Sequence, residues 1–469
     1  MAIERQLSAI QPWPTLALTL LAAVAALSGC GEPETAKPGV QPSGSGTATA
    51  VEDSDGSGAV RPAAGFWLAE LKSPGGTLPF GLILEDDGTN INGTLVNGPE
   101  KIAIPETNYE DGELTLFFPH YDSRIVAQVS EDGTEFTGDW SKRRSVESWT
   151  NMTFAARRAG DDTPPNTSSE SMGEMERYLG RWSVRFAQSK DPAVAVLQKA
   201  EDGRPWGTFL TTTGDYRFLS AQIVDGGRPQ TGGDAGNSAA EIDAPPMLRM
   251  SVFDGAHAFL FLARLSEAGE IEGDFWSSDT WRETWTATRD DSASLPNGFQ
   301  QTKWDASISL ADLVFPDLEG NRVSLADEKF AGKARIVEVF GTWCPNCHDA
   351  AAYLGELDAK YGPRGLSIVG VAFEHTGDFQ RDVQQVKRYI DRHKVGYPVL
   401  LAGLSDKTQA TKAFSALDRI RSYPTTIFMH ANGRVRAVYS GFSGPATGEE
   451  YTALRDEFEA LIEELLNEE

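Results

Sequence analysis

Between residues 65 and 158, short stretches in which apolar and polar residues alternate are separated by polar turns. Asp-Gly or Asn-Gly pairs mark the turns at residues 87–88, 97–98, 111–112 and 132–133. Turn signals at this regular spacing predict antiparallel strands arranged as a meander, a sandwich or a small barrel. The expected strands are Leu78–Leu84, Ile91–Val96, Leu114–Phe118, Ile125–Val129 and Met152–Ala155.

A second β-rich region, from about residue 175 to residue 290, shares motifs with the first. Gly65-Phe66-Trp67 corresponds to Gly180-Arg181-Trp182, and Gly93-Thr94-Leu95 corresponds to Gly207-Thr208-Phe209. The most specific match pairs residues 130–141 with residues 266–277, which both contain Ser-Glu and a later Gly-Asp. The sequence therefore predicts two copies of one β domain. An insertion is expected in the second copy at residues 226–246, which are nearly all Gly, Ala, Pro, Asp and Asn.

Neither copy contains a recognisable catalytic constellation, and His120 and His257 do not align with each other. Tryptophans recur through both copies and offer two interpretations. They either line a ligand cavity or fill the cores, and the core is the more frequent place for such side chains. These residues are Trp67, Trp140, Trp149, Trp182, Trp276, Trp281 and Trp285.

The pattern changes after about residue 305. An apolar stretch at residues 335–340 predicts a buried strand, and residues 349–360 carry apolar side chains at helical spacing. Between them lie Cys344 and Cys347, placed so that Cys344 begins the helix. Unpaired N–H groups and the helix dipole favour negative charge there, so a thiolate is stabilised. Because thiolates attack disulfides, the spacing predicts a dithiol switch.

Trp343-Cys344-Pro345-Asn346-Cys347 after an apolar strand resembles the thioredoxin superfamily, and in particular its exported, membrane-tethered TlpA/ResA-like thiol–disulfide oxidoreductases. Three further stretches resemble this group: an N-terminal hairpin at residues 315–325, the strand at residues 366–373, and a cis-proline loop at residues 423–426. The resemblance covers residues 305–469 and implies an α/β thioredoxin-like domain there. The fold class expected for the whole chain is two antiparallel β repeats, each barrel- or sandwich-like, followed by this domain.

Cys344 is expected to be the attacking nucleophile and Cys347 the resolving thiol that releases the mixed disulfide. Glu338 stands six residues before Cys344, where thioredoxin has its buried acid, although TlpA-like proteins more often carry Asn there. Strand alternation would turn Glu338 inward beneath the dithiol, with a raised pKa and a role in relaying the proton of Cys347. A shift of register by one residue would instead expose it.

The resemblance also implies that Pro424 follows a cis peptide bond facing the dithiol, leaves a backbone edge free for substrate and keeps metals off the thiols. A trans turn proline is the alternative. Trp343 is expected to be a contact platform beside the dithiol. Glu374 matches a position where ResA-like proteins often place an acid near the site, and a solvated side chain is the equal alternative.

Cys-Pro-Asn-Cys-His also spells the attachment signature of c-type haem, with His348 as axial ligand. The strand–dithiol–helix context and the downstream proline argue against haem, and His348 is then expected to be exposed on the first helical turn. A structural zinc site needs four ligands, and no second Cys/His cluster is visible. The peroxiredoxin pattern around a peroxidatic cysteine is missing too. No cofactor or metal is therefore expected.

The N-terminus predicts export and anchoring. An apolar run at residues 14–27 is short for a membrane span and ends in Leu27-Ser28-Gly29-Cys30, which resembles a bacterial lipobox. The implied processing is cleavage before Cys30 and lipid attachment to it. An ordinary signal peptide with a chance cysteine is the alternative. The chain has only three cysteines, so no structural disulfide framework is expected.

The formal net charge of −26 argues against nucleic acid or anionic lipid as partner surfaces. The expected organisation along the chain has seven parts. In order, they are a lipoprotein signal peptide (1–29), a disordered tether (30–62), β copy 1 (63–158), a linker (159–173), β copy 2 (174–290), a second linker (291–304) and the redox domain (305–469).

Together these features predict a lipid-anchored, periplasm-facing envelope enzyme that reduces disulfides of exported proteins through Cys344 and Cys347. By resemblance, its substrates would be cysteines of apocytochrome c or of copper-site assembly proteins, and a membrane electron donor would re-reduce it. An oxidant or isomerase role is one alternative, because Pro345-Asn346 does not determine the potential. The other is a ligand- or partner-binding β-repeat lipoprotein with an ancillary redox domain.

Overall fold

The computed structural model describes residues 60–159, 169–226, 245–332 and 334–467. The expected signal peptide, Cys30 and nearly all of the tether lie outside these residues, as does most of the expected insertion at 226–246. Residues 57–469 form one compact unit. Within the described ranges, no helix is both long and apolar enough to cross a bilayer.

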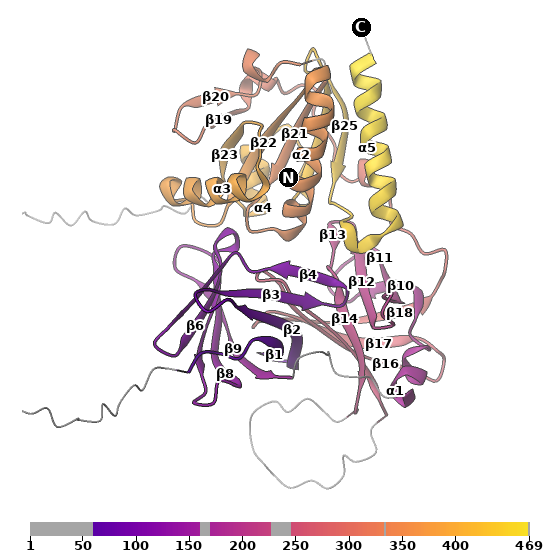
Figure 1. The fold of residues 1–469 in the computed structure, drawn as a ribbon. Coiled ribbons are helices and arrows are strands. Elements are labelled where there is room, and N and C mark those ends of the chain that lie inside the picture. Colours follow the sequence, from indigo (N-terminus) through magenta and orange to yellow (C-terminus); the bar gives the residue numbers. More distant parts are fainter. Residues whose placement is uncertain (1–59, 160–168, 227–244, 333, 468–469) are drawn as a thin grey trace, which may run out of the picture. The chain divides into compact units, whose positions relative to one another are not determined.

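The first nine strands form one antiparallel sheet in the order β4-β3-β2-β1-β9-β8-β7-β6-β5. Consecutive strands are neighbours except where β1 pairs with β9, so the meander curls back on itself and stays open between β4 and β5. We call this the first β sheet (Figure 1). Its strands are β1 (Gly65–Ser73), β2 (Gly76–Asp86), β3 (Ile91–Asn97), β4 (Glu100–Ala103), β5 (Glu106–Glu110), β6 (Glu113–Phe118), β7 (Ser123–Val129), β8 (Glu135–Arg143) and β9 (Trp149–Arg158).

The next nine strands form a second antiparallel sheet in the order β11-β10-β18-β17-β16-β15-β14-β12-β13. Because β11 also pairs with β12, this second β sheet closes into a barrel. The two sheets together are called the β module below. The strands are β10 (Gly180–Phe186), β11 (Ala193–Lys199), β12 (Pro205–Thr211), β13 (Gly214–Asp215), β14 (Leu219–Val224), β15 (Met247–Phe253), β16 (Ala258–Leu265), β17 (Ile271–Ser277) and β18 (Trp281–Arg289).

The motifs that matched in sequence lie on strands at corresponding places in the two sheets. The Gly-x-Trp pair begins β1 and β10, and the Gly-Thr pair lies in β3 and β12. In the Gly-Asp pair, an added Cβ at Gly138 would overlap the Val126 carbonyl, and one at Gly273 would overlap the Leu262 carbonyl. The same close approach of a neighbouring strand therefore requires glycine at both places.

Aromatic side chains fill the interiors of both sheets. Four of the seven tryptophans are at most 1% exposed, which confirms the expectation that these four are core residues: Trp67, Trp140, Trp182 and Trp285. In the second sheet, Phe261 stacks on Phe209 and on Phe275 at centroid distances of 4.4 Å and 4.3 Å. Trp149 and Trp281 lie at the surface instead. The tryptophans therefore do not share a ligand cavity.

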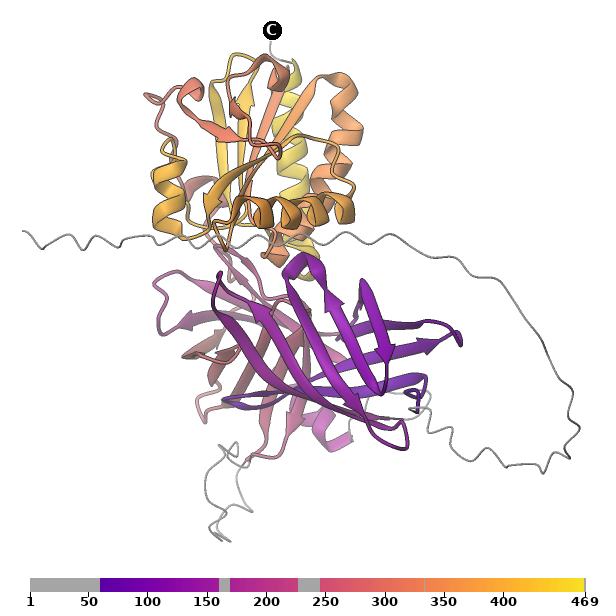
Figure 2. The same cartoon turned by 90° about the vertical axis from the view of Figure 1, so that its left-hand side faces the viewer.

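Residues 334–467 carry a five-stranded sheet in the order β23-β22-β21-β24-β25. This part of the chain is drawn in orange and yellow in Figure 2. Strands β21 to β23 are parallel, while β24 and β25 run antiparallel to their neighbours. A hairpin of β19 (Val314–Pro316) and β20 (Arg322–Ser324) confirms the expected N-terminal hairpin. The sheet strands are β21 (Ala334–Phe340), β22 (Leu366–Glu374), β23 (Val399–Leu404), β24 (Thr425–His430) and β25 (Val435–Ser440).

Four helices accompany this sheet: α2 (Pro345–Tyr361), α3 (Phe379–His393), α4 (Lys407–Ala413) and α5 (Glu449–Asn467). Helix α3 is capped by the Asp378 carboxylate, which accepts from the Arg381 N–H at 3.2 Å. Helices α2 and α5 lie side by side (Figure 1). Lys360 of α2 pairs with Glu459 of α5, and Arg364, in the turn just after α2, pairs with Glu463 of α5. The apolar faces of these helices and the fully buried strand β21 share one hydrophobic core.

Both segments expected as linkers contain packed structure. The short helix α1 (Ser169–Met175) begins within the first and ends two residues beyond it at Met175, whose side chain is fully buried. In the second, Thr302 is buried and shares a hydrogen bond of 2.6 Å with Ser440. Trp304 forms an isolated bridge to Leu417. Residues 302–304 therefore pack against the C-terminal domain.

Candidate functional site

Cys344 occupies the N-cap position of helix α2, with Pro345 as the first helical residue. Strand β21, the central strand of the sheet, ends at Phe340, and three residues separate it from Cys344. Both cysteines are free thiols. The Cys344 side chain is 8% exposed, and its Sγ lies 3.3 Å from the carbonyl oxygen of Tyr423. Cys347, one helical turn on, is fully buried.

The two thiols differ in acidity, as the expected roles require. A hydrogen bond from the Cys347 thiol lowers the pKa of Cys344 most, the Cys347 and Asn346 backbone N–H groups add to it, and burial opposes them. Lys142, a residue of β8, also lowers this pKa through its positive charge. Burial raises the pKa of Cys347 well above its usual range, and the neighbouring Cys344 raises it further. The arrangement favours one thiolate, on Cys344.

Glu338 lies in β21 with its side chain buried, so the exposed alternative is wrong. Among the described residues, neither carboxyl oxygen has a hydrogen-bond partner of normal geometry. Burial raises the pKa of Glu338 to about 8, and the nearby Thr426 hydroxyl offsets this only in part. Its negative charge contributes to the raised pKa of Cys347, which places the carboxyl within electrostatic reach of that thiol.

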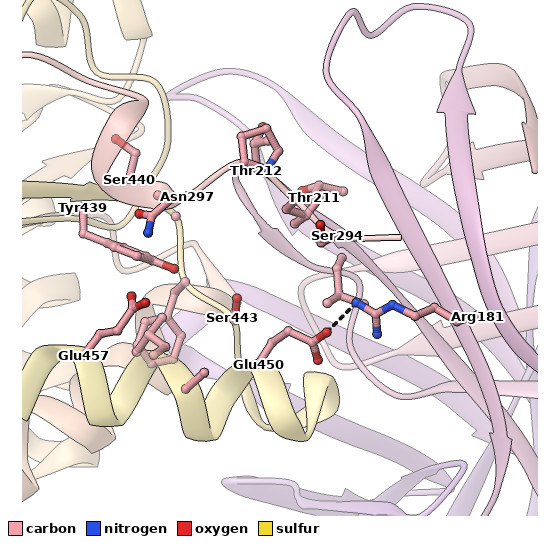
Figure 3. A pocket seen from close by; sticks show the side chains of 18 residues that line it. Arg181, Thr211, Thr212, Ser294, Asn297, Tyr439, Ser440, Ser443, Glu450 and Glu457 are labelled. Atoms are coloured by element: carbon pink, nitrogen blue, oxygen red, sulfur yellow. Dashed lines mark hydrogen bonds and ion pairs between the residues drawn. The ribbon is translucent and has the colours of Figure 1, made fainter. Parts of the chain in front are cut away.

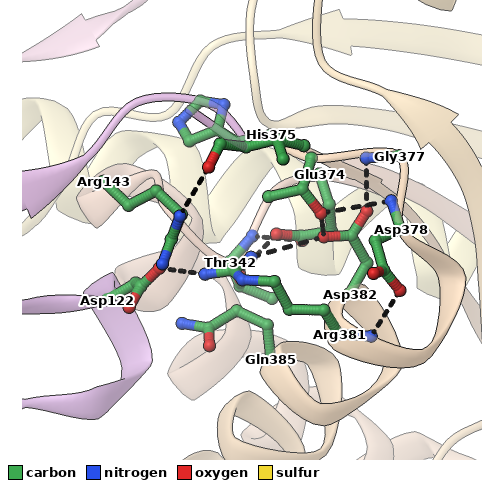
Figure 4. A network of polar contacts seen from close by, with 12 residues as sticks. Asp122, Arg143, Thr342, Glu374, His375, Gly377, Asp378, Arg381, Asp382 and Gln385 are labelled. Carbon is green, nitrogen blue, oxygen red and sulfur yellow. Dashed lines mark hydrogen bonds and ion pairs between the residues drawn. The ribbon is translucent and has the colours of Figure 1, made fainter. Parts of the chain in front are cut away.

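Glu374 ends β22 and is also buried, so the solvated alternative is wrong for this residue as well. Its carboxylate accepts hydrogen bonds from the backbone N–H and the hydroxyl of Thr342, at 2.9 Å and 2.8 Å (Figure 4). Burial raises the pKa of Glu374 to about 8, and these hydrogen bonds lower it partly. Glu374 thus holds the turn that connects β21 to the dithiol.

The peptide bond between Tyr423 and Pro424 is cis, as expected. Pro424 precedes β24, and the Tyr423 carbonyl is the group that faces Cys344. Trp343 lies between two rings: it stacks on His375 at 4.6 Å and meets Tyr423 edge-on at 5.3 Å. Its indole N–H donates to the Phe373 carbonyl at 3.0 Å. Trp343 is therefore held rigidly beside the dithiol.

His348 is buried, so the expectation of an exposed side chain is wrong. Its Nε2 lies 2.7 Å from the Thr342 carbonyl oxygen, and because a carbonyl can only accept, Nε2 donates. Nδ1 of the neutral ring then accepts from Nε2 of His393, at 2.6 Å. Burial lowers the pKa of His348 well below its usual range. Since both ring nitrogens are engaged, His348 is not placed as a haem ligand.

The sequence interpretation missed the residues that the β module brings to the site. Arg217 is buried and pairs with Glu100 at 2.8 Å and with Asp349 of α2. Lys142, whose pKa burial lowers to about 8, donates to the Ala256 carbonyl at 2.9 Å. Asp122 contacts Arg381 of α3 (Figure 4). No motif marks these side chains, because their chemistry depends on contacts between segments more than 100 residues apart.

A cavity of about 260 Å³ lies elsewhere, between β12, residues 294–298 and helix α5 (Figure 3). Its arginine, Arg181, is committed to Glu450 at 2.5 Å and to the Ala293 carbonyl at 2.6 Å. The remaining lining residues are mostly neutral, with Glu457 as a further acid. The cavity contains none of the expected site residues.

Comparison with known proteins matches residues 305–454 to the Redoxin family. The thiol-disulfide oxidoreductase ResA of Halalkalibacterium halodurans is 26% identical over 151 residues, 32% of this chain and 76% of that protein. ResA of Bacillus thuringiensis strain Al Hakam is 28% identical over 144 residues, which cover 30% of this chain and 75% of the length of that protein.

Solved structures match the same share of the chain. A thioredoxin-family thiol:disulfide interchange protein from Chlorobium tepidum TLS is 25% identical, with a TM-score of 0.25, over 33% of this chain and 92% of its own. A secreted Mycobacterium tuberculosis disulfide oxidoreductase homologous to E. coli DsbE is 17% identical, with a TM-score of 0.24, over 32% of this chain and 93% of its own.

Proposed function

From the premise that residues 305–454 belong to the Redoxin family, we propose that this chain is a thiol–disulfide oxidoreductase that reduces disulfides of exported proteins. The observation that carries the proposal is the pair of unlike thiols. Cys344 has a lowered pKa at a helix N-terminus, and Cys347, buried one turn later, has a raised one. This asymmetry is what sequential attack and resolution require.

In the reaction, the Cys344 thiolate attacks one sulfur of a substrate disulfide and forms a mixed disulfide, and the other substrate sulfur leaves as a thiolate. Cys347 then loses its proton and attacks Cys344, which releases the second substrate sulfur. The substrate gains two electrons and two protons, and the protein is left with a Cys344–Cys347 disulfide. A thiol electron donor must reduce that disulfide before the next cycle.

Glu338 supports the second step as a proton acceptor for Cys347. With a pKa of about 8, the carboxyl is mostly protonated at neutral pH and exchanges its proton most readily slightly above it. It has no competing hydrogen bond of normal geometry to hold it in one form. Trp343 and the backbone around Pro424 form the surface that receives the substrate.

Export and anchoring are part of the same proposal. The lipobox-like Leu27-Ser28-Gly29-Cys30 would tether the mature protein to an envelope membrane, and a membrane electron donor would re-reduce it. The relatives are named thiol-disulfide oxidoreductases, and we propose exported proteins such as apocytochrome c or copper-site assembly proteins as the substrates. Cys30→Ser should accumulate as unprocessed precursor or lose its membrane fraction on flotation. A wild-type protein that is wholly soluble after signal cleavage would contradict the anchor.

We further propose that the two β sheets arose by duplication of one nine-stranded unit. The matched glycine motifs on corresponding strands, and the equivalent strand orders, support this. A binding role for the β module is the second candidate function. It is favoured by the charged residues that the module presents to the dithiol region, Arg217 and Asp122.

The direct test is reduction of a protein disulfide, with insulin as the probe. The reduced full-length chain should convert one insulin disulfide per dithiol in a single turnover. Cys344→Ser should abolish the reaction, and Cys347→Ser should accumulate a covalent mixed disulfide through Cys344. A Cys344→Ser variant that reduces insulin at the wild-type rate would overturn the proposal.

A further inference from the structure

The β module touches the C-terminal domain on the side that carries the dithiol. Two of its segments make the contacts described below: the 3₁₀ helix η1 (Pro119–Tyr121) with Asp122, and the β12–β13 hairpin with the following residues to Arg217. Each reaches a different part of the site, as the following contacts show.

The η1 segment covers the start of helix α3 and the side of α2. The Gln385 side chain donates to the Pro119 carbonyl at 2.7 Å, and Arg381 contacts Asp122 (Figure 4). The rings of His120 and Tyr121 lie 5.1 Å and 4.7 Å from that of His348. His348 directly follows Cys347, so this segment packs against the dithiol helix itself.

The β12–β13 hairpin covers the turn between the two cysteines. Gly214 lies so close to Asn346 that a Cβ added there would overlap the Asn346 side chain. On the neighbouring loop, the Gly444 N–H donates to the Asp215 carboxylate at 2.7 Å. Arg421, three residues before Pro424, donates to the Thr212 hydroxyl at 2.9 Å. The hairpin therefore spans from the dithiol to the cis-proline loop.

Arg217 connects the parts of this contact. It pairs with Glu100 of β4 at 2.8 Å, lies 3.7 Å from Asp254, and pairs with Asp349, two residues after Cys347. Its side chain is only 10% exposed. Burial raises the pKa of Glu100 to about 7 and that of Asp349 to about 6. Asp349 is the partner of Arg217 that lies on the C-terminal domain, so separation of the two surfaces would break this pair.

The dithiol beside this contact has little exposed surface. Cys344 is 8% exposed and Cys347 is fully buried. A thiolate can attack only a disulfide sulfur that reaches it, and exchange rates depend on this access. Interfaces between domains of one chain are commonly polar and resemble transient protein contacts, so relative motion is the ordinary expectation for them.

We infer that the β module is an intramolecular lid on the dithiol, closed by Arg217 and its carboxylate partners, which a disulfide-bearing protein must displace to reach Cys344. This inference rests on the proposed function, because it says how the substrate of that same site gains access. The lid would favour disulfide-bearing proteins that displace the β module over disulfides that do not.

The test compares access of a small and a bulky thiol reagent to Cys344. The full-length chain carries Cys30→Ser and Cys347→Ser, so that Cys344 is the single thiol. Alkylation rates are measured with iodoacetamide and with a maleimide joined to a polyethylene glycol of about 5 kDa. The ratio of the bulky to the small rate cancels any change in the thiolate fraction, which both reagents share.

Arg217→Gln should raise this ratio by about tenfold or more, because the open population limits the bulky reagent. Arg185→Gln, an exposed arginine of β10, is the matched control and should leave the ratio unchanged. The double variant Arg381→Ala/Gln385→Ala weakens only the η1 contact and should raise the ratio too, which keeps the test decisive if Arg217→Gln fails to fold.

Equal ratios in the wild type, the control and the folded opening variants would overturn the lid. The alkylation test of the lid is independent of the insulin test of the proposed function, because alkylation of Cys344 needs no reductase activity. For insulin reduction, the opening substitutions are placed in a chain that keeps both Cys344 and Cys347. If they admit the bulky reagent in the single-thiol chain but the dithiol chain fails to reduce insulin, the function is contradicted and the lid stands.

Discussion

Glu338 is the titrating residue whose substitution should have the clearest effect on the pH dependence of stability. An unfolded glutamate titrates near about 4.3, whereas burial raises the native pKa of Glu338 to about 8. Between these two pKa values the native state holds a proton on Glu338 that the unfolded state has lost. The free energy of unfolding of the wild type therefore falls as the pH rises from the lower value to the higher one, and Glu338 causes no further fall above that range. Glu338→Gln should abolish that fall and gain on the order of 2–4 kcal/mol over the wild type above that range.

Urea unfolding of the reduced protein between pH 4 and 9 measures this gain, with the exposed Glu319→Gln as control. The same variant should slow resolution of a mixed disulfide and remove the inflection near pH 8 from its rate, while attack by Cys344 persists. An unchanged pH profile would leave Glu338 with a structural role only.

Lys142 gives the second prediction at this scale. The hydrogen bond from Cys347 lowers the pKa of Cys344 most, and Lys142 adds a positive charge from β8. Lys142→Gln should raise the pKa of Cys344 by up to about one unit, since a single nearby charge shifts a pKa by this order. Thiolate absorbance against pH measures the shift. Substitution of an exposed lysine, Lys72→Gln, should leave the pKa of Cys344 unchanged. If Lys142→Gln also leaves it unchanged, Lys142 does not act on the dithiol.

Much of the C-terminal site could be predicted residue by residue. Cys344 and Cys347 follow from C-x-x-C spacing at a helix start, and the cis peptide before Pro424 follows from the resemblance. His348 could not, because its burial depends on His120 and His393, which approach it only in the folded chain. Lys142 and Arg217 carry no local signal for the same reason.

Among the elements, β3 of the first sheet and β15 of the second are joined by one buried side chain. The Asn97 amide donates to the Phe253 carbonyl at 2.9 Å, and its oxygen accepts from the Phe253 N–H at 3.1 Å. Asn97→Ala should leave both backbone groups buried without partners and cost about 2 kcal/mol or more. Thermal or urea unfolding measures this cost, and the exposed Asn108→Ala should be neutral. A neutral Asn97→Ala would mean that water replaces the amide.

Turn chemistry made the strands predictable, since Asp-Gly and Asn-Gly pairs mark hairpins locally. The closure of the second sheet by β11 and β12 was beyond the sequence pattern, because an open meander and a barrel share the same alternation. Helix α1 was missed because most of it lies in the polar segment interpreted as linker, while its buried residue Met175 lies just beyond that segment.

At the scale of the whole molecule, the order of β-rich and α/β regions could be predicted, and the contact between them could not. Sequence patterns report what each segment buries, but not which polar surfaces meet. The Arg217 cluster is made of Glu100, Asp254 and Asp349, each of which is an ordinary charged residue in its own segment. The lid is therefore a property of the assembled chain.

The direction of electron flow tests the central claim. Helix-terminal stabilisation of a thiolate is worth about 0.3–1 kcal/mol at exposed sites, and about 30 mV corresponds to 1.4 kcal/mol for a two-electron couple. Lys142 also stabilises the Cys344 thiolate, and with it the reduced form of the protein. Cys347, whose pKa is raised, stays a thiol and adds no second thiolate. We therefore expect a potential nearer to that of thioredoxin, about −270 mV, than to that of strong oxidants, about −120 mV.

The decisive measurement is the reduction potential of the Cys344–Cys347 couple in the full-length protein, obtained by equilibration with glutathione buffers and thiol trapping. Cys30→Ser removes the third thiol from the readout. A value close to about −270 mV is the result expected of a disulfide reductase. A value more oxidising than about −180 mV, the level of protein disulfide isomerase, would contradict it and favour an oxidant or isomerase.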